Sequence, residues 1–386
     1  MFTYTETEEI RVLAAELEAL RERHDLSATL PRRWSGRLRR DLEVEAVAAS
    51  TMIEGVRVTV DDVRRILVGD VPPHVTEKDA ALVAGYRDAM SYALRRADDP
   101  AFRWHAELLL AIHDRVLAGA HHLGAGRYRT GGVYLVDRHD GTIRFTPPAA
   151  DDVPELVDAA MDWVQRGGLS TPVAAAYVHA AVAAIHPFTD GNGRTARICA
   201  SLALLRGGFR RPEFTSLEEW WGRHPADYYA TFRSLGPEWS PDADITPFVH
   251  AHIAAHVAQV KEYEERLEVQ RDVWTALENI CAEIGDVRTV DALYDAFLGH
   301  TVTNRYYREL AQVSPVTAAS DLGRLVAAGL LEVIGAGVST GYVAAPALME
   351  RLAAELGLTG GPGPQVPPEE SRTWITAQLR WRVRER

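Results

Sequence analysis

Residues 186–197 of this chain read HPFTDGNGRTAR. The segment 171–185 before this run starts with a Thr-Pro pair and continues as an apolar stretch, a pattern that predicts a helix. The segment 194–206 carries an apolar stripe at helical spacing and is followed by the breaker Gly207-Gly208. The run is therefore expected to form a loop between two helices, with His186 at the end of the first helix.

The centre of this loop has the composition of a polyphosphate site. Gly191, Asn192 and Gly193 would present backbone N–H groups, unshielded by large side chains, at the positive end of a helix. Arg194 and Arg197 are three residues apart on that helix, so they point along one face and suit successive phosphates. The spacing therefore favours a di- or triphosphate as the ligand.

Two further side chains at the loop add chemistry. Asp190 directly precedes the expected phosphate-binding loop. One carboxylate, together with phosphate oxygens and water, completes the octahedral coordination that Mg²⁺ requires. His186 is an imidazole with an ordinary pKa of about 6.5, suited to taking a proton from a hydroxyl at neutral pH. Alternatively, His186 could be a core histidine that closes a helix, and the two arginines could lie on a solvated helix face. The occurrence of all these residues in one run favours the phosphate site.

The same run matches the pattern HxFx(D/E)GNGRxxR at every specified position, and in this it resembles the Fic enzymes. The resemblance implies a protein adenylyltransferase that moves AMP from ATP onto Ser, Thr or Tyr hydroxyls, its own included. It also implies a helical-bundle fold with a β-hairpin flap, and ATP and Mg²⁺ as cofactors. The related Doc branch departs from this loop pattern and transfers phosphate instead, so AMP transfer is favoured here.

The resemblance also assigns roles within the run. His186 would be the general base, Phe188 would anchor the loop in the core, and Asp190 would bind Mg²⁺. The anion hole for the α and β phosphates would be formed by Gly191, Asn192 and Gly193. Arg194 would hold the leaving pyrophosphate, and Arg197 would hold the γ-phosphate.

An earlier segment, Ser50-Thr51-Met52-Ile53-Glu54-Gly55, matches the family's inhibitory pattern (S/T)xxxE(G/N). Glu54 is expected at a helix C-terminus, where the helix dipole disfavours a carboxylate, so a cation should lie close to it. The resemblance implies that this cation is Arg197, which the γ-phosphate needs. The alternative is an exposed glutamate before a C-cap glycine, Gly55. In some relatives this glutamate supports removal of AMP, so that reaction also stays open.

Features outside the loop give weaker signals. The β-rich runs within 132–146 predict a hairpin, which corresponds to the flap on which a target protein would dock by strand addition. Tyr228 and Tyr229 resemble a family segment near the adenine pocket, although aromatic residues at helical spacing are more often core. His113 is interpreted as a packed histidine. A homodimer is a further expectation from the resemblance, although no residue pattern shows the contact.

The C-terminal third predicts a second functional class. Helical segments ending near residue 328, followed by a two-stranded segment to 343, indicate a winged-helix module and thus a DNA-binding regulator. The expected recognition helix, 316–324, carries one arginine and one aspartate, which is a poor composition for phosphate contacts. An interdomain or dimer role is therefore favoured over DNA. Trp374 and Trp381 are seven residues apart in a basic tail and would align on one face of a helix.

The chain length, net charge and cysteine count limit these interpretations. The chain has 386 residues and a formal net charge of −12, which argues against general nucleic-acid binding. The two cysteines suggest neither a disulfide framework nor a zinc site, and the absence of a long apolar run predicts no membrane partner and a cytoplasmic location. We expect a mostly α-helical chain with an N-terminal helical segment including the inhibitory helix (1–75), a Fic catalytic core (76–262), a winged-helix-like domain (263–358), and a Pro/Gly linker with a basic Trp/Arg tail (359–386).

Overall fold

The computed structural model describes residues 2–26, 32–118, 120–136, 140–210, 217–285, 287–361, 363 and 365–385. The chain divides into two compact units. The first unit consists of Met1–Leu67 and Val71–Val260, and the second of Val68–Asp70 and Lys261–Arg386. The N-terminal helical segment therefore packs in the same unit as the loop 186–197.

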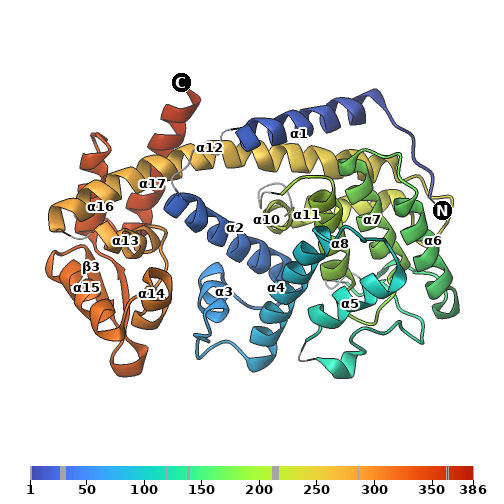
Figure 1. The fold of residues 1–386 in the computed structure, drawn as a ribbon, viewed down its shortest axis with the longest axis horizontal. Coiled ribbons are helices and arrows are strands. Elements are labelled where there is room, and N and C mark those ends of the chain that lie inside the picture. Colours follow the sequence, from blue (N-terminus) through green and yellow to red (C-terminus); the bar gives the residue numbers. More distant parts are fainter. Residues whose placement is uncertain are drawn as a thin grey trace. The chain divides into compact units, whose positions relative to one another are not determined.

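The first unit is almost entirely helical, as the sequence predicts (Figure 1). Its helices are α1 (Glu8–Leu26), α2 (Arg32–Ile53), α3 (Val60–Leu67), α4 (Glu77–Ala97), α5 (Ala106–Val116), α6 (Val153–Gln165), α7 (Thr171–Ile185), α8 (Asn192–Arg206), α10 (Glu218–Arg223), α11 (Pro225–Thr231) and the part of α12 (Thr246–Ile284) up to Val260.

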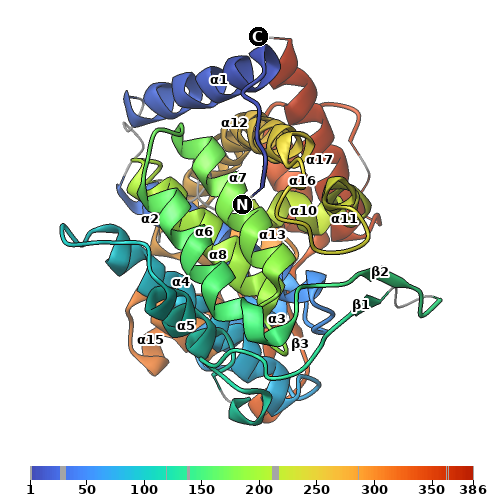
Figure 2. The ribbon, with the colours of Figure 1, turned by 90° about the vertical axis from the view of Figure 1, so that its right-hand side faces the viewer.

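Helices α7 and α8 form the centre of this unit. They lie side by side in both views (Figures 1 and 2) and pack against each other along their lengths. Almost every residue of α7 is buried, as expected for a helix that is apolar all round. Its many alanines allow the neighbouring helices to approach closely. The predicted loop between two helices is confirmed, because α7 ends at Ile185 and α8 begins at Asn192.

Local capping signals explain where several helices start. At α3, Thr59 and Asp62 form a reciprocal capping pair: the Thr59 N–H donates to Asp62 Oδ2 at 2.9 Å, and the Asp62 N–H donates to Thr59 Oγ1 at 3.1 Å. At α7, the N-cap is Ser170, one residue earlier than expected, and Pro172 occupies the first turn. Each device satisfies or removes an N–H group that the helix itself leaves unpaired.

The predicted hairpin is present but short. Strand β1 (Leu135–Val136) pairs antiparallel with β2 (Ile143–Phe145), and residues 137–139 of the predicted hairpin lie outside the described residues. Figure 2 shows the hairpin projecting away from the helices of its unit. A bridge between Thr146 and Glu238 fixes the end of the hairpin segment to the body of the first unit.

The second unit contains the remaining part of α12 and a set of short elements. These are α13 (Val290–Phe297), α14 (Asn304–Ala311), α15 (Pro315–Ala327), β3 (Leu331–Ile334), β4 (Gly341–Ala344), α16 (Pro346–Glu355) and α17 (Pro368–Arg384). Strands β3 and β4 are antiparallel, with Leu331 opposite Ala344, and Val302 forms a further antiparallel bridge with Tyr342. The helix, turn, helix and strand pair expected from the sequence are all formed.

The C-terminal tail contains a helix, in agreement with the spacing of Trp374 and Trp381 in the sequence. Residues Pro368–Arg384 form helix α17, which packs against α16. Its buried apolar residues are Ile375 and Leu379, four apart, and Ser371 is buried as well, whereas Trp381 is 62% exposed. The aliphatic pair, not the tryptophan pair, therefore holds the helix. Positions 362, 364 and 386 of this predicted segment lie outside the described residues.

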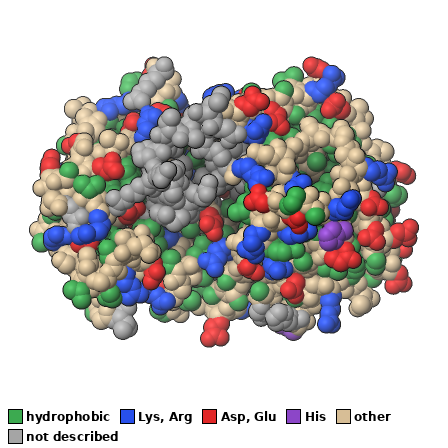
Figure 3. All heavy atoms as spheres, viewed as in Figure 1, with side chains coloured by type: hydrophobic (Ala, Val, Ile, Leu, Met, Phe, Trp, Pro, Cys, Tyr) green, Lys and Arg blue, Asp and Glu red, His purple; other side chains and the backbone are tan. Residues whose placement is uncertain are grey.

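Surface charge, helix hydrophobicity and the cysteines relate to the partners predicted from the sequence. Figure 3 shows Lys and Arg side chains interspersed with Asp and Glu over one face of the described residues. No described helix is both long enough and apolar enough to cross a membrane. Cys199 and Cys281 are buried free thiols, and no group of three or more potential metal-ligating side chains gathers in the described part of the chain.

Candidate active site

The loop between α7 and α8 is closed by its own side chains. Gly191 has a φ of +79°, a left-handed conformation that favours glycine. The buried Asn192 amide donates to the carbonyl of Phe188 and accepts from its N–H, both at 2.9 Å. Because the Asn192 side chain is engaged in this way, only its main chain is available to an anion.

Phe188 points from the loop into the core of the first unit. Its ring is fully buried and stacks on the imidazole of His113, with centroids 3.6 Å apart. His113 accepts the Gly126 N–H at Nδ1 (3.0 Å) and donates from Nε2 to the carbonyl of Asp190 (3.0 Å). Burial lowers the pKa of His113 to about 4. His113 is therefore a neutral, packed histidine that supports the loop, which confirms its interpretation.

His186 follows α7 in a left-handed conformation, with φ +50° and ψ +58°. A non-glycine residue in this region is strained by about 1–3 kcal/mol, so surrounding contacts must hold it there. Its Nδ1 lies 3.2 Å from the carbonyl of Ala183, and since a carbonyl only accepts, Nδ1 carries the proton. Nε2 is thus left as the basic nitrogen. Burial lowers the pKa of His186 below its usual value, so the ring is neutral at pH 7.

Asp190 and Arg194 lie at the start of α8. Asp190 Oδ1 accepts the Gly191 N–H at 2.6 Å and an Arg194 Nη2 hydrogen at 3.3 Å. The Arg194 side chain is only 2% exposed. Its Nε and Nη1 are buried without a hydrogen-bond partner among the described residues. A buried guanidinium with two unsatisfied nitrogens is costly, and an anion at the helix N-terminus would satisfy them.

Arg197 is fully engaged. Its Nη2 donates to Glu54 Oε1 at 2.8 Å and to the Ser50 carbonyl at 3.0 Å, while Nε donates to Ser50 Oγ at 2.9 Å. Glu54 also lies over the cradle, because a Cβ built on Gly193 would meet Glu54 Oε1 at 2.3 Å. Gly55, with φ +85°, turns the chain after α2. The structure thus brings Ser50, Glu54 and Arg197 together.

The two tyrosines lie in different environments. Tyr228 is buried, and its hydroxyl lies 3.2 Å from both Arg197 Nη1 and His179 Nε2. Tyr229 is 58% exposed, and its hydroxyl reaches the Ile53 carbonyl at 3.4 Å. The Tyr228 hydroxyl therefore links Arg197 to His179 inside the first unit.

Some residues of the site are not evident from the sequence. Arg129 donates to the His186 carbonyl at 2.9 Å, and the buried pair Tyr86 and Glu218 is hydrogen-bonded behind Ser50. These contacts join segments far apart in the chain, so no local pattern marks them. Arg129 stands in the run Gly126-Arg127-Tyr128-Arg129, where no local pattern distinguishes it from the exposed Arg127.

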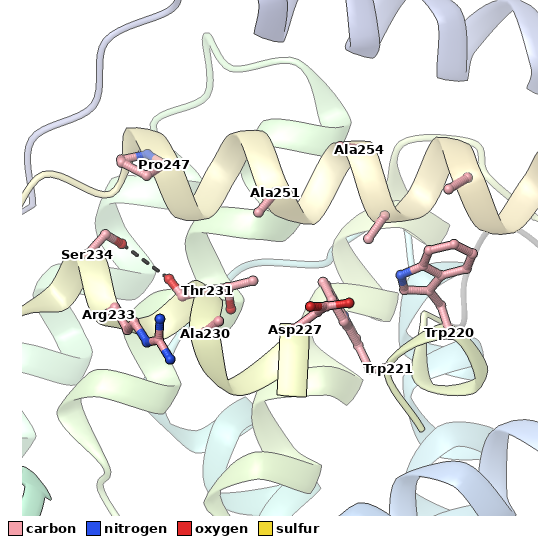
Figure 4. Close-up of a pocket in the computed structure, with 12 residues that line it drawn as sticks. Trp220, Trp221, Asp227, Ala230, Thr231, Arg233, Ser234, Pro247, Ala251 and Ala254 are labelled. Atoms are coloured by element: carbon pink, nitrogen blue, oxygen red, sulfur yellow. Dashed lines mark hydrogen bonds between the residues drawn. The ribbon is translucent and has the colours of Figure 1, made fainter. Parts of the chain in front are cut away.

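A separate hollow of about 580 Å³ lies beside α12 in the first unit (Figure 4). Trp220, Asp227 and Arg233 line one side, and Ala251 and Ala254 of α12 line the other. Its lining includes none of the described loop residues 186–197, so it is distinct from the cradle.

With this geometry established, residues 103–204 match the model of the Fic/DOC family. The chain carries a Fic/DOC family domain. This Fic/DOC domain contains α7, the loop and most of α8, and it confirms the resemblance seen in the sequence for this part of the chain. The matched residues end before α10 and do not include α2.

Curated relatives of the Fic/DOC domain are protein adenylyltransferases. The chain is 32% identical over 204 residues to the protein adenylyltransferase Fic of Nematostella vectensis, covering 52% of this chain and 44% of that protein. It is 35% identical over 170 residues to the protein adenylyltransferase fic-1 of Caenorhabditis elegans, covering 42% of this chain and 29% of that protein. The chain thus spans less than half the length of these relatives and is distantly homologous to them.

Solved structures share the fold of the Fic/DOC domain. A Fic family protein from Desulfovibrio desulfuricans G20 superposes with a TM-score of 0.59 at 24% identity, over 89% of this chain and 98% of that chain. Fic-1 from C. elegans gives a TM-score of 0.53 at 26% identity, over 67% of this chain and 72% of that chain. These likenesses agree with a mostly helical Fic fold that carries small hairpins.

Proposed function

We propose that this chain is a protein adenylyltransferase that uses ATP and Mg²⁺. His186 Nε2 takes the proton of a Ser, Thr or Tyr hydroxyl, and the hydroxyl oxygen forms a bond to the α-phosphorus. The bond from that phosphorus to the bridging oxygen breaks, and pyrophosphate leaves. The products are the target carrying AMP, free pyrophosphate, and His186 carrying the proton of the hydroxyl.

The observation that carries this proposal is the state of Arg194. Its buried Nε and Nη1 have no hydrogen-bond partner among the described residues, and its Nη2 donates to Asp190 Oδ1, which also accepts the Gly191 N–H. A polyphosphate supplies the acceptors that these nitrogens lack. The main-chain N–H groups of residues 191–193 would hold the α and β phosphates, and Arg194 would hold the leaving pyrophosphate.

Asp190 is the residue proposed to hold Mg²⁺. Its side chain is 47% exposed and lies at the lip of the cradle, and a single carboxylate together with phosphate oxygens and water suits this ion. When bound, Mg²⁺ neutralises charge on the phosphates. The residues present therefore fit the ion, although the tight contacts of Oδ1 with Gly191 and Arg194 leave Oδ2 as the better ligand.

The proposal includes restraint by Glu54. The γ-phosphate would bind Arg197, but the carboxylate of Glu54 already accepts from Nη2 of that arginine. The same carboxylate lies where a ligand on Gly193 would sit. Two anions compete for one buried cation, so binding of ATP in the productive orientation requires Glu54 to leave.

The proposed partners are a target protein and a second copy of the chain. The target protein would dock on the hairpin 132–146, whose exposed Tyr134, Val136 and Ile143 offer an apolar strand surface. A homodimer is the second proposed assembly. The winged-helix assignment of residues 263–358 is supported by the order of α13, α14, α15, β3 and β4. DNA binding has little support, because Arg324 of α15 pairs with the buried Asp321.

The test is incubation of three proteins with Mg²⁺ and ATP labelled at the α-phosphate, repeated with the label at the γ-phosphate. The proteins are the wild type, Glu54→Gly, and Glu54→Gly with His186→Ala. We expect label from the α position only, strongest in Glu54→Gly. His186→Ala should lower it by about 10²–10⁴, the usual effect of losing a general base.

Other results of this labelling experiment would indicate other functions. Label from the γ position alone would make the chain a phosphotransferase, and stronger labelling from UTP or GTP would change the nucleotide. Equal labelling of wild type and Glu54→Gly would contradict the restraint. No label, combined with release of AMP from a modified protein, would indicate the reverse reaction. No label, combined with salt-dependent DNA retardation, would favour a regulator.

A further inference from the structure

Arg129 connects the loop to the hairpin segment. It is only 4% exposed. Its Nε donates to the His186 carbonyl at 2.9 Å, and its backbone N–H donates to the Pro187 carbonyl at 2.9 Å. The other end of the guanidinium donates from Nη1 to the Gly131 carbonyl at 2.9 Å and from Nη2 to the Pro148 carbonyl at 2.6 Å. One side chain therefore joins the loop to both ends of the hairpin segment.

The chemistry of these contacts is unusual for a buried arginine. All of its side-chain hydrogen bonds to described residues end on main-chain carbonyls, and none ends on a carboxylate. Burial without a counter-charge lowers the pKa of Arg129 and is unfavourable for stability. A planar fork with donors on three nitrogens, however, can fix three carbonyls in defined directions. Arg129 therefore fixes the directions of three carbonyl groups, although burial of its charge lowers the stability of the fold.

The carbonyl that Arg129 fixes belongs to the strained residue of the site. His186 has a left-handed backbone, so its ring direction depends on contacts that keep this conformation. The Ala183 carbonyl holds Nδ1 from one side, and Arg129 holds the following peptide group. Together these two contacts set the direction in which Nε2 points.

We propose that Arg129 is a positioning residue, which holds the His186 backbone in its left-handed conformation and fixes the ends of the hairpin segment relative to Nε2. A hydroxyl presented by a segment docked on the hairpin then meets a base at a constant distance. This inference rests on the proposed AMP transfer for the role of the base. Arg129 touches neither the nucleotide-binding arginines nor Asp190 in the described contacts, so its effect should fall on turnover and not on nucleotide binding.

Lysine at this position separates the charge from the geometry. Arg129→Lys keeps the positive charge but replaces the three-nitrogen fork with a single ammonium, which cannot reach three separate carbonyls. Arg127→Lys is the matched control, because Arg127 is exposed and lies two residues earlier. Arg129→Gln removes the buried charge and keeps an amide donor, and it replaces Arg129→Lys if that protein does not fold.

The first measurement is steady-state AMP transfer to the protein's own hydroxyls or to a fixed acceptor protein, with each variant in the Glu54→Gly background. We expect Arg129→Lys to lower kcat by about 10- to 100-fold, because small misplacement of a catalytic group has effects of this size. KM for ATP should change by less than about twofold. Arg127→Lys should match the parent. An unchanged kcat, or a loss of ATP affinity and melting temperature in parallel with kcat, would overturn the proposal.

The second measurement needs no turnover. Diethyl pyrocarbonate modifies neutral imidazole, so the pH dependence of the modification rate, followed by mass spectrometry of the peptide containing His186, gives the pKa of that residue. Burial and the charge of Arg129 lower this pKa, while Glu54 and Asp190 raise it. In Arg129→Lys we expect the pKa to move up toward 6.5, because a loosened ring is better hydrated. No change would count against the positioning role.

The two measurements separate the two proposals. If the Glu54→Gly parent does not transfer AMP but Arg129→Lys moves the pKa of His186, the AMP transfer is wrong and the positioning role stands. If the parent transfers AMP and Arg129→Lys changes neither kcat nor the pKa, the positioning role is wrong and the AMP transfer stands.

Discussion

Single residues in and around the loop have measurable effects, and the clearest is that of His113 in α5, which packs against Phe188 of the loop. Its pKa is about 4 in the folded chain because of burial, against an ordinary value of about 6.5. The unfolded chain therefore binds a proton more readily, and this group's contribution to stability is full above about pH 6.5 and is lost as the pH falls toward 4. The difference corresponds to about 3 kcal/mol by linkage.

We predict that His113→Gln reduces the loss of stability between pH 7 and 4. Glutamine keeps one donor for the Asp190 carbonyl and one acceptor for the Gly126 N–H but does not titrate. The measurement is the free energy of unfolding of the first unit as a function of pH. His122→Gln, at an exposed position, is the control and should leave the pH dependence unchanged. An equally steep acid transition in His113→Gln would contradict the prediction.

The second prediction at this scale concerns Tyr228. Tyr228→Phe removes the hydroxyl between Arg197 and His179 and leaves buried nitrogens of both residues short of a partner. We expect a loss of about 1–3 kcal/mol in the stability of the first unit, the usual effect of stranding a buried polar group. Hydrogen exchange of amides in α8 under increasing urea measures it. Tyr229→Phe, at an exposed site, should change stability by less than about 0.5 kcal/mol.

The sequence was most informative at this scale where chemistry alone restricts the choice of residue. Glycine at 191 is required by its backbone angle, and the basic and acidic residues of 186–197 are close in sequence as well as in space. Arg129, Tyr86 and Glu218 were not predicted. Their contacts join segments that are 57 to 132 residues apart, and nothing in a local pattern encodes such a pairing.

At the scale of elements, helix starts and stops were predictable because their causes are local. Thr59 with Asp62, Pro172 and Gly207 each act within one turn. Helix length follows the same local signals: α12 continues to Ile284, because no glycine or proline interrupts the stretch after Pro247. Among the described residues of the hairpin, the paired strands are Leu135–Val136 and Ile143–Phe145, which are shorter than the β-rich runs of the sequence.

Helix α17 yields a prediction that distinguishes its two apolar pairs. Leu379 is 2% exposed and Trp381 is 62% exposed. We expect Leu379→Ala to destabilise the second unit by about 2–5 kcal/mol, the range for removing a buried leucine side chain. Hydrogen exchange of the α16 and α17 amides measures this. Trp381→Ala should leave the exchange rates nearly unchanged; faster exchange in Trp381→Ala than in Leu379→Ala would mean that the tryptophan holds the helix.

For the whole molecule, the division into two units makes a single unfolding transition a poor description. The chain offers one buried thiol for each unit, Cys199 in the first and Cys281 in the second. Burial raises the pKa of Cys199 to about 12, so this thiol is unreactive while the first unit is folded.

We predict that both thiols resist iodoacetamide in the native protein and become labelled at different urea concentrations. Mass spectrometry of the two peptides gives a separate midpoint for each unit. Leu379→Ala should lower the midpoint for Cys281 and leave that for Cys199 in place. Identical midpoints in every variant would mean that the two units unfold together.

The contact between Glu54 and Arg197 has a consequence for the chain during its synthesis. The two residues are 143 positions apart, with the carboxylate nearer the N-terminus. A ribosome makes the chain from that end, and N-terminal segments emerge and fold first. Helix α2 therefore exists before α8 has been translated. Under the proposed function, a nascent chain never presents the phosphate cradle before the carboxylate that would compete for it has been made.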